Sequence, residues 1–308
     1  MRPAKRILGM ALGREQDNRL SALVENLKLG LCTPFLGAGA SAPSIPTASH
    51  LAQDWATRVG YPFPDPWNLP RVMQYVATMT YSGDALLLKR LIADQIEDAP
   101  TPDFSKPHQV HKVLASCDLP LYVTTNYDDF MLRALAQTAD RLPRREISPW
   151  YDTNPRNRPP SPLASRRYAP SAGEPLIFHL HGHHSEPRSL VLTEDDNIDY
   201  LVREAGDIRG DKVKVLPDYV RGRLRATSLL FLGYSLQDWT FHVLFRHLLA
   251  GSPQRRNHVS VQLNPGRASA MVRGYWERYL GSQHIWIFWG TTEDFMKKLV
   301  RGLSGGVR

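Results

Sequence analysis

The sequence predicts an α/β fold: a parallel sheet of about six strands, with helices on both faces and a helical insertion. Short, strongly apolar runs recur along the 308 residues, and segments with helical periodicity separate them. Runs that are apolar throughout are typical of strands buried on both faces, as in parallel sheets covered by helices. Several of these runs also end in glycine or polar residues, and ligands bind at such strand ends in open α/β sheets.

Short apolar runs bounded by turn residues are predicted to form buried strands. β-Branched and aromatic side chains favour an extended backbone in several of them. In chain order the runs are 31–36 (LCTPFL), 121–126 (LYVTTN), 175–182 (PLIFHLHG), 228–235 (SLLFLGYS), 258–264 (HVSVQLN) and 284–290 (HIWIFWG).

Helices are predicted before and between these strands. Over 14–29, apolar residues recur at i, i+3, i+4 and i+7, and Gly30 supplies a stop. Thr291 and Asp294 resemble a capping box at the start of the last helix. Segment 141–175 holds eight prolines and many arginines, so we expect an irregular surface loop there. The other predicted helices are 128–137, with Asp128 or Asp129 as cap, 194–205, 212–226 and 238–250.

The chain is expected to have two parts. Residues 1–30 form an N-terminal helical segment, and residues 31–303 form one domain that carries the site. Within this domain, about 48–116 looks mostly helical and has turn signals at several prolines, so we interpret it as an insertion between the first two strands and not as an independent domain.

Composition excludes several classes of protein. Cys32 and Cys117 are the only cysteines, so a disulfide scaffold and a four-cysteine zinc module are excluded. No apolar run approaches the roughly 20 residues that span a bilayer, and no convincing signal-peptide cleavage site follows the start, so we expect a cytoplasmic protein. Lys plus Arg is 38 and Asp plus Glu is 30, a net charge of +8. That balance suits a dinucleotide or a nucleic acid, or is a solvated surface.

A glycine-rich loop follows the first predicted strand. Gly37-Ala-Gly-Ala-Ser-Ala42 fits G-x-G-x-x-G/A, in which glycines allow a tight turn and let backbone amides approach a pyrophosphate. A plain structural turn is the alternative. A dehydrogenase would need a strand with an acidic end about 20 residues later. Residues 57–59 lie in a helical pattern instead, so we expect a phosphate cradle in a Rossmann-like parallel sheet, but no dehydrogenase.

Polar residues also end the second and third strands. Thr125, Asn126 and Asp128 follow the second strand, where Asn126 can orient a water or a ribose hydroxyl; helix caps are the alternative for Asn126 and Asp128. His181 ends the third strand and can act as a general base near neutral pH. His179 would share a strand face with His181, so a metal pair is a rival interpretation, although no acidic or cysteine partner stands at ligand spacing.

The fourth and fifth strands end in a similar way. Gly233 permits close approach of a backbone, and Ser235 offers a hydroxyl to a ribose or phosphate. Asp238 is expected to cap a helix. Asn264 could hold a ribose, or belong to a plain Asn-Pro-Gly turn.

Together and in this order, these segments resemble the sirtuin superfamily. FLGAGAS (35–41) resembles its nucleotide loop, TTNYD (124–128) the strand end with its catalytic Asn, HLHG (179–182) the segment with its catalytic His, and FLGYSLQD (231–238) its ribose-binding loop. The closing VQLNPG and FWGTTEDF look like the Sir2-type branch of bacterial antiphage defence systems. The resemblance spans about 34–300.

The resemblance implies that NAD binds along the carboxyl rim of the sheet, with Asn126 and His181 as the catalytic residues. Sirtuin deacylases carry a zinc module with two C-x-x-C pairs, and this chain has none, so lysine deacylation is not expected and no metal site is predicted. Ile45-Pro46 is also not followed by the usual Asp-Phe. The implied contacts to NAD are Gly37, Ala38, Gly39, Ser41, Thr125, Asp128, Gly233, Ser235 and Asn264.

The expected activity is that of an NAD+ glycohydrolase. Cleavage of the nicotinamide N-glycosidic bond would give nicotinamide and ADP-ribose, and the chain would be the NAD-depleting effector of a defence complex. The resemblance also suggests a homo-oligomer and a partner such as a HerA-type ATPase or another sensor. A catalytically silent NAD or ADP-ribose sensor is one alternative. A nucleic-acid-binding or nuclease subunit is another, suggested by the net charge and by Arg141, Arg144, Arg145, Arg156, Arg158, Arg166 and Arg167.

Overall fold

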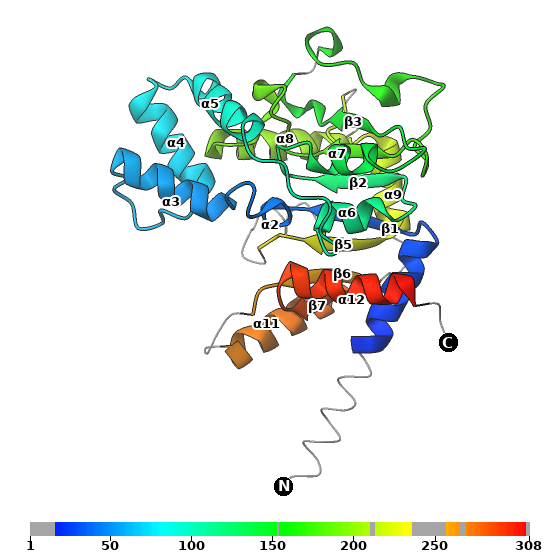
Figure 1. Cartoon of the computed structure of the whole chain (residues 1–308). Coiled ribbons are helices and arrows are strands. Elements are labelled where there is room, and N and C mark those ends of the chain that lie inside the picture. Colours follow the sequence, from blue (N-terminus) through cyan, green and yellow to red (C-terminus); the bar gives the residue numbers. More distant parts are fainter. Residues whose placement is uncertain (1–15, 153, 210–212, 236–256, 265–268, 306–308) are drawn as a thin grey trace.

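A computed structural model describes residues 16–152, 154–209, 213–235, 257–264 and 269–305. Within these residues the chain forms a seven-stranded sheet in the order β3-β4-β2-β1-β5-β6-β7, and every pair of neighbouring strands is parallel (Figure 1). The strands are β1 (Cys32–Leu36), β2 (Leu121–Thr124), β3 (Arg144–Ile147), β4 (Leu176–His179), β5 (Ser228–Leu232), β6 (His258–Gln262) and β7 (Ile285–Trp289).

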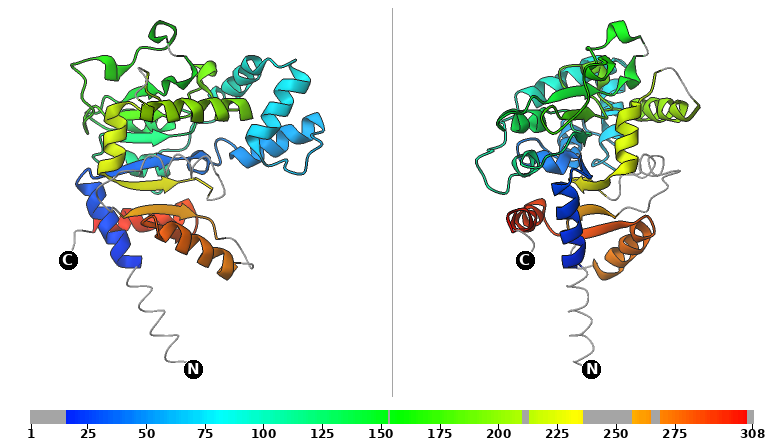
Figure 2. Two further views of the ribbon diagram at one scale, coloured as in Figure 1. Left: turned by 180° about the vertical axis from the view of Figure 1, so that it is seen from behind. Right: turned by 90° about the vertical axis from the view of Figure 1, so that its right-hand side faces the viewer.

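Helices cover both faces of this sheet, as predicted. In Figures 1 and 2, α6, α7 and α12 lie on one face, and α8, α9 and α11 lie on the other. The predicted helix at 238–250, with Asp238 as its cap, lies outside the described residues. The described helices are one over 16–28, α2 (Ala38–Ser41), α3 (Ala48–Val59), α4 (Leu69–Thr80), α5 (Ala85–Glu97), α6 (Val110–Ala115), α7 (Phe130–Ala136), α8 (Glu194–Arg209), α9 (Asp218–Ala226), α11 (Ser269–Gly281) and α12 (Thr292–Ser304).

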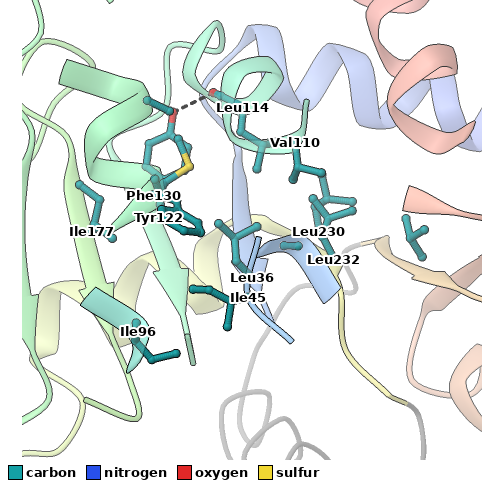
Figure 3. Packing of buried hydrophobic residues seen from close by; sticks show 14 of the residues in the cluster. Leu36, Ile45, Ile96, Val110, Leu114, Tyr122, Phe130, Ile177, Leu230 and Leu232 are labelled. Atoms are coloured by element: carbon teal, nitrogen blue, oxygen red, sulfur yellow. Dashed lines mark hydrogen bonds between the residues drawn. The ribbon is translucent and has the colours of Figure 1, made fainter. Parts of the chain in front are cut away.

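Two buried clusters of side chains pack against the two faces of the sheet. On one face, the Tyr122 ring of β2 is buried, and its hydroxyl donates to the Leu114 carbonyl oxygen of α6 over 3.0 Å (Figure 3). On the other face, Phe178 of β4 belongs to a cluster with Tyr200 of α8 and Leu224 of α9. Every residue of β1, β2, β4, β5 and β6 is buried, which confirms the expectation from their continuous apolar character.

The predicted start of the last helix is confirmed, and this helix packs against the N-terminal one. The Thr291 hydroxyl oxygen accepts a hydrogen bond from the Asp294 N–H over 3.0 Å, and the hydroxyl donates to the Asp294 carboxylate over 2.7 Å. A Cβ added at Gly302 of α12 would lie 2.7 Å from a methyl carbon of Val24. The helix over 16–28 therefore lies directly against α12.

The chain between β1 and β2 is mostly helical, as expected, and α3, α4 and α5 extend beyond the carboxyl ends of the strands (Figure 1). A buried ion pair links this insertion to α8: the Lys89 ammonium lies 2.5 Å from the Asp196 carboxylate, and also 5.4 Å from the centre of the Trp150 ring. Removing one member of a buried pair leaves an uncompensated charge, which costs about 3–5 kcal/mol. The pair therefore constrains how the insertion sits against α8.

Segment 141–175 is not wholly irregular, and this prediction was wrong. Residues Arg144–Ile147 form β3, which pairs with β4 alone and is an edge strand. An edge strand tolerates charged side chains, so the sequence Arg-Arg-Glu-Ile gives no apolar signal. Short 3-10 turns follow at Pro149–Tyr151, Pro155–Asn157 and Pro162–Ala164.

Helix α11, between β6 and β7, is a second element that the sequence did not predict. Its Met271 side chain is 87% exposed and Tyr275 is also exposed, so no clean apolar stripe marks the helix.

None of the helices in the described part of the chain combines the length and the apolar character that crossing a bilayer requires.

Candidate active site

The predicted site residues lie in loops at the carboxyl ends of neighbouring strands. The order β4-β2-β1-β5 brings four of these strand ends together. β2 ends at Thr124 and β4 at His179, earlier than the apolar runs suggested. Asn126 and His181 therefore lie just beyond the hydrogen-bonded ladder, in adjacent loops.

The glycines of the first loop allow it to touch the end of β5. The Gly37 N–H donates to the Leu232 carbonyl oxygen over 2.8 Å, and the Gly39 N–H donates to the Gly233 carbonyl oxygen over 3.1 Å. A Cβ at either Gly37 or Gly39 would lie 2.8 Å from backbone atoms of Gly233, which itself has a φ of +77°. Close packing of two backbones thus requires these glycines. Three amides of this loop, those of Gly37, Gly39 and Ala40, thus donate within the protein, and half-buried Ala38 lies beside them in α2.

Tyr234 connects three strand ends, and the sequence analysis missed its role. Its hydroxyl donates to the Leu36 carbonyl oxygen over 3.0 Å and lies 2.8 Å from the Thr125 hydroxyl. Because its one proton is directed to Leu36, Thr125 is the donor in the second bond. Thr125, predicted to contact NAD, is thus tied to Tyr234. An aromatic residue directly after a close-approach glycine was the available signal.

The Asn126 side chain has a fixed orientation. Its amide nitrogen donates to the Gly37 carbonyl oxygen over 3.0 Å and to the Ser41 hydroxyl oxygen over 2.9 Å. A carbonyl oxygen only accepts, so the amide nitrogen must face Gly37 and Oδ1 must point the other way. Among the described residues, no hydrogen bond uses Asn126 Oδ1. This oxygen therefore faces away from Gly37 and Ser41.

Ser41 and Asp128 support Asn126 from within the protein. The Ser41 hydroxyl donates to Asp128 Oδ2 over 2.7 Å, and the two residues are 2% and 6% exposed. The N-cap residue of α7 is Asp129, one of the two predicted caps, and Asp128 Oδ1 accepts from the Phe130 N–H over 3.0 Å at the start of this helix. Burial raises the pKa of the Asp128 carboxyl to about 6, against the opposing hydrogen bonds from Ser41 and Phe130.

His181 and His179 do not share a face, and this prediction was wrong. The strand ends at His179, and the chain turns at Leu180 and His181, before Gly182. The His181 ring consequently packs edge-on against Tyr200 at 5.2 Å, whereas the His179 ring lies 4.6 Å from the His183 ring. No group of three or more His, Cys, Asp or Glu side chains in the described part of the chain is arranged to hold a metal ion.

Hydrogen bonds join the loop that carries Asn126 to the loop that carries His181. Tyr127 supplies two of them: its carbonyl oxygen accepts from the His184 N–H over 2.9 Å, and its hydroxyl donates to the Val191 carbonyl oxygen over 2.6 Å. The Val191 N–H in turn donates to the His181 carbonyl oxygen over 2.9 Å. The two predicted catalytic residues are therefore mounted on one connected unit.

Ser235 and Asn264 are exposed beyond the ends of β5 and β6, and the proline and glycine of the predicted Asn-Pro-Gly turn lie outside the described residues.

A cavity of about 200 Å³ adjoins the glycine loop, whose Ser41 carbonyl oxygen accepts from the Ile45 N–H over 3.2 Å. Its mostly apolar lining combines the end of this loop with α5 of the insertion, and includes Ile45, Pro46, Leu51, Ile92 and Ile96.

Three of the arginines considered for nucleic-acid binding are directed to protein groups. Arg141 donates to the Cys117 carbonyl oxygen over 2.9 Å, Arg144 lies 3.7 Å from the Glu174 carboxylate, and Arg145 donates to His183 Nε2 over 3.0 Å. The exposed arginines of this segment are Arg144, Arg156, Arg166 and Arg167. These contacts weaken the case for a continuous basic surface.

The chain is similar in sequence to one family of domains and to two named hydrolases. The model of the SIR2-like domain family matches residues 120–283. The chain is 24% identical over 258 residues to the NAD(+) hydrolase ThsA of Acinetobacter baumannii (strain 532279). This aligned region covers 82% of this chain and 47% of that protein. The chain is 23% identical over 217 residues to the NAD(+) hydrolase ThsA of Enterococcus faecium, with 70% and 39% covered.

The chain therefore spans less than half the length of these two relatives. The family match includes the loops of Asn126, His181 and Gly233, and begins after the glycine loop. The resemblance to Sir2-type proteins is confirmed: the chain belongs to the SIR2-like domain family.

Proposed function

We propose that this protein is an NAD+ glycohydrolase that cleaves the bond between nicotinamide and ribose. The observation that carries the proposal is the Asn126 amide. Its nitrogen is held by Gly37 and Ser41, and its oxygen is left for a ligand beside the loop of His181. The similarity to two NAD(+) hydrolases supports NAD as the substrate.

The chemistry follows from the leaving group. Nicotinamide departs as a neutral molecule and takes the electron pair of the broken C–N bond, so positive charge develops on the ribose C1′ carbon. Asn126 Oδ1 would orient the attacking water or a ribose hydroxyl. His181, when neutral, would accept the proton as the water oxygen bonds to C1′, and such base catalysis is worth about 10²–10⁴-fold. The products are nicotinamide and ADP-ribose.

The sequence supports hydrolysis over protein deacylation. The C-x-x-C pairs of the deacylase zinc module are missing from all 308 residues. A lysine-acylated peptide therefore should not be a co-substrate, and water should be the acceptor of the ADP-ribosyl group.

The direct test is to incubate the purified protein with NAD and to separate the products by chromatography. We expect equal amounts of nicotinamide and ADP-ribose. Cyclic ADP-ribose would show that a ribosyl group, not water, captures C1′, and binding without turnover would favour the sensor alternative. Loss of DNA binding with rising salt would instead support the nucleic-acid alternative.

We also propose that NAD depletion serves antiphage defence and that activity depends on assembly. The expected partners are further copies of this chain and a sensor such as a HerA-type ATPase. The assay is therefore run with the protein alone, with that partner and with DNA. Cells that express the parental chain should lose NAD after phage challenge, and cells that express His181→Ala should not.

A further inference from the structure

Asn126 lies beyond the end of β2, yet side chains bond both polar groups of its backbone. Its N–H donates to the Thr124 hydroxyl oxygen over 2.9 Å, and its carbonyl oxygen lies 3.2 Å from Nδ1 of His179. The preceding residue, Thr125, still donates to Leu36 of β1, so Asn126 is the first residue to rely on side chains. The position of its backbone thus depends on His179.

The contact determines which nitrogen of His179 carries a proton. A carbonyl oxygen only accepts, so Nδ1 of His179 must be the donor. The residue is 1% exposed, and burial lowers its pKa to about 3, so the ring is neutral at physiological pH. A neutral imidazole carries one N–H, which leaves Nε2 unprotonated. This buried Nε2 has no hydrogen-bond partner among the described residues.

Neighbouring groups keep the His179 ring in place. The His183 ring lies edge-on at 4.6 Å, and Nε2 of His183 accepts from Arg145 of β3, since a guanidinium can only donate. Burial lowers the pKa of His183, with smaller contributions from His179 and Arg145, so this ring is neutral as well. The edge strand therefore supports a pair of neutral imidazoles directly behind Asn126.

We propose that His179 is a positioning residue for NAD cleavage, whose Nδ1–H holds the Asn126 backbone and thereby sets where the Asn126 amide meets the substrate. This inference rests on the proposed function. A displacement of about 1 Å in a reacting arrangement can cost about 100-fold in rate. His179 itself touches no reacting atom in this account.

Two substitutions separate positioning from packing. His179→Asn keeps an N–H donor near the place of Nδ1 but leaves a larger void, whereas His179→Leu fills more of the ring volume and has no donor. We expect His179→Leu to lower kcat about 10–100-fold with KM for NAD unchanged, and His179→Asn to stay within about 3-fold of the parent. Thermal stability should follow the opposite order, because the larger void costs more.

A second measurement is independent of turnover. In protein labelled with ¹⁵N-histidine, the NMR signals of His179 should report a proton on Nδ1 and no titration between about pH 5 and 8. If the parental protein consumes no NAD alone, with the partner or with DNA, the proposed function fails while this readout still tests the contact. A proton on Nε2, a titration near the ordinary histidine pKa, or equal kcat values for His179→Leu and the parent would each overturn the inference.

Discussion

The Ser41 hydroxyl donates to the Asp128 carboxylate over 2.7 Å, at a position from which solvent is almost excluded. The same hydroxyl oxygen accepts from the Asn126 amide over 2.9 Å. Ser41 therefore transmits the position of a buried carboxylate to the amide that we propose faces NAD. Orientation by a supporting group of this kind is what precise catalytic geometry requires.

Removal of the Ser41 hydroxyl should weaken catalysis more than binding. Ser41→Ala takes away one of the two acceptors of the Asn126 amide and leaves the Asp128 carboxylate short of a donor. An unsatisfied buried group costs about 1–3 kcal/mol. We expect kcat for NAD hydrolysis to fall about 10-fold or more, measured by nicotinamide release. Ser41→Cys, which keeps a weak donor, should fall less, and a parental kcat for Ser41→Ala would remove the hydroxyl from the account.

Asp128 should make the folded protein less stable as the pH rises from about 4 to 6. Its pKa is raised by burial from 3.8 to about 6. Between these values the folded state holds a proton that the unfolded state has released, so the free energy of unfolding falls with rising pH. Asp128→Asn lacks this dependence. The stability of Asp128→Asn relative to the parent should therefore rise by about 1–3 kcal/mol between pH 4 and 7, as measured by urea unfolding; a difference that stays constant would contradict the raised pKa.

The Tyr234 hydroxyl should contribute to stability through two hydrogen bonds. Tyr234→Phe removes the bonds to Leu36 and Thr125, each worth about 0.5–1.5 kcal/mol. We expect a loss of about 1–3 kcal/mol in the free energy of unfolding, together with a lower kcat/KM. Tyr75→Phe is the matched control, because the Tyr75 hydroxyl makes no hydrogen bond among the described residues. Equal effects of the two substitutions would argue against the role of Tyr234.

Gly233 should tolerate no side chain. Its φ is +77°, and an added Cβ would lie 2.3 Å from the Ala40 nitrogen. Gly60 is a matched control, since it has a φ of +63° and nothing within 4 Å of an added Cβ. Gly60→Ala should lose about 1–2 kcal/mol from backbone strain alone. Gly233→Ala should lose much more, or fail to fold, and NAD turnover should disappear. Similar stabilities for the two variants would show that the glycine loop can move away from Gly233 at the end of β5 without loss of stability.

The sheet was predictable from sequence because its central strands are buried on both faces. Their apolar runs are continuous, as LYVTTN of β2 and SLLFLGYS of β5 illustrate. β3 escaped the analysis because it pairs with β4 alone, and its Arg-Arg-Glu-Ile sequence matches that position. The other edge strand, β7, was predicted because its sequence Ile-Trp-Ile-Phe-Trp is apolar, so the charged side chains of β3, and not its edge position alone, concealed it.

The candidate site was predictable as a set of strand ends but not as a geometry. Periodicity continued beyond the true end of β4, so it gave His179 and His181 a common face, which the turn at Leu180 and His181 abolishes. The contacts of Ser41 with Asp128, 87 residues apart, have no local signature. Long-range side-chain bonds of this kind arise only when the strand ends have been brought together.

The most direct measurement of the central claim is the rate of nicotinamide release by Asn126→Ala and His181→Ala, with Gln53→Ala on the exposed face of α3 as control. Under conditions in which the parent consumes NAD, we predict that both site variants lose at least about 100-fold in rate, that they remain folded by circular dichroism, and that Gln53→Ala matches the parent. Parental rates in Asn126→Ala and His181→Ala would contradict the account.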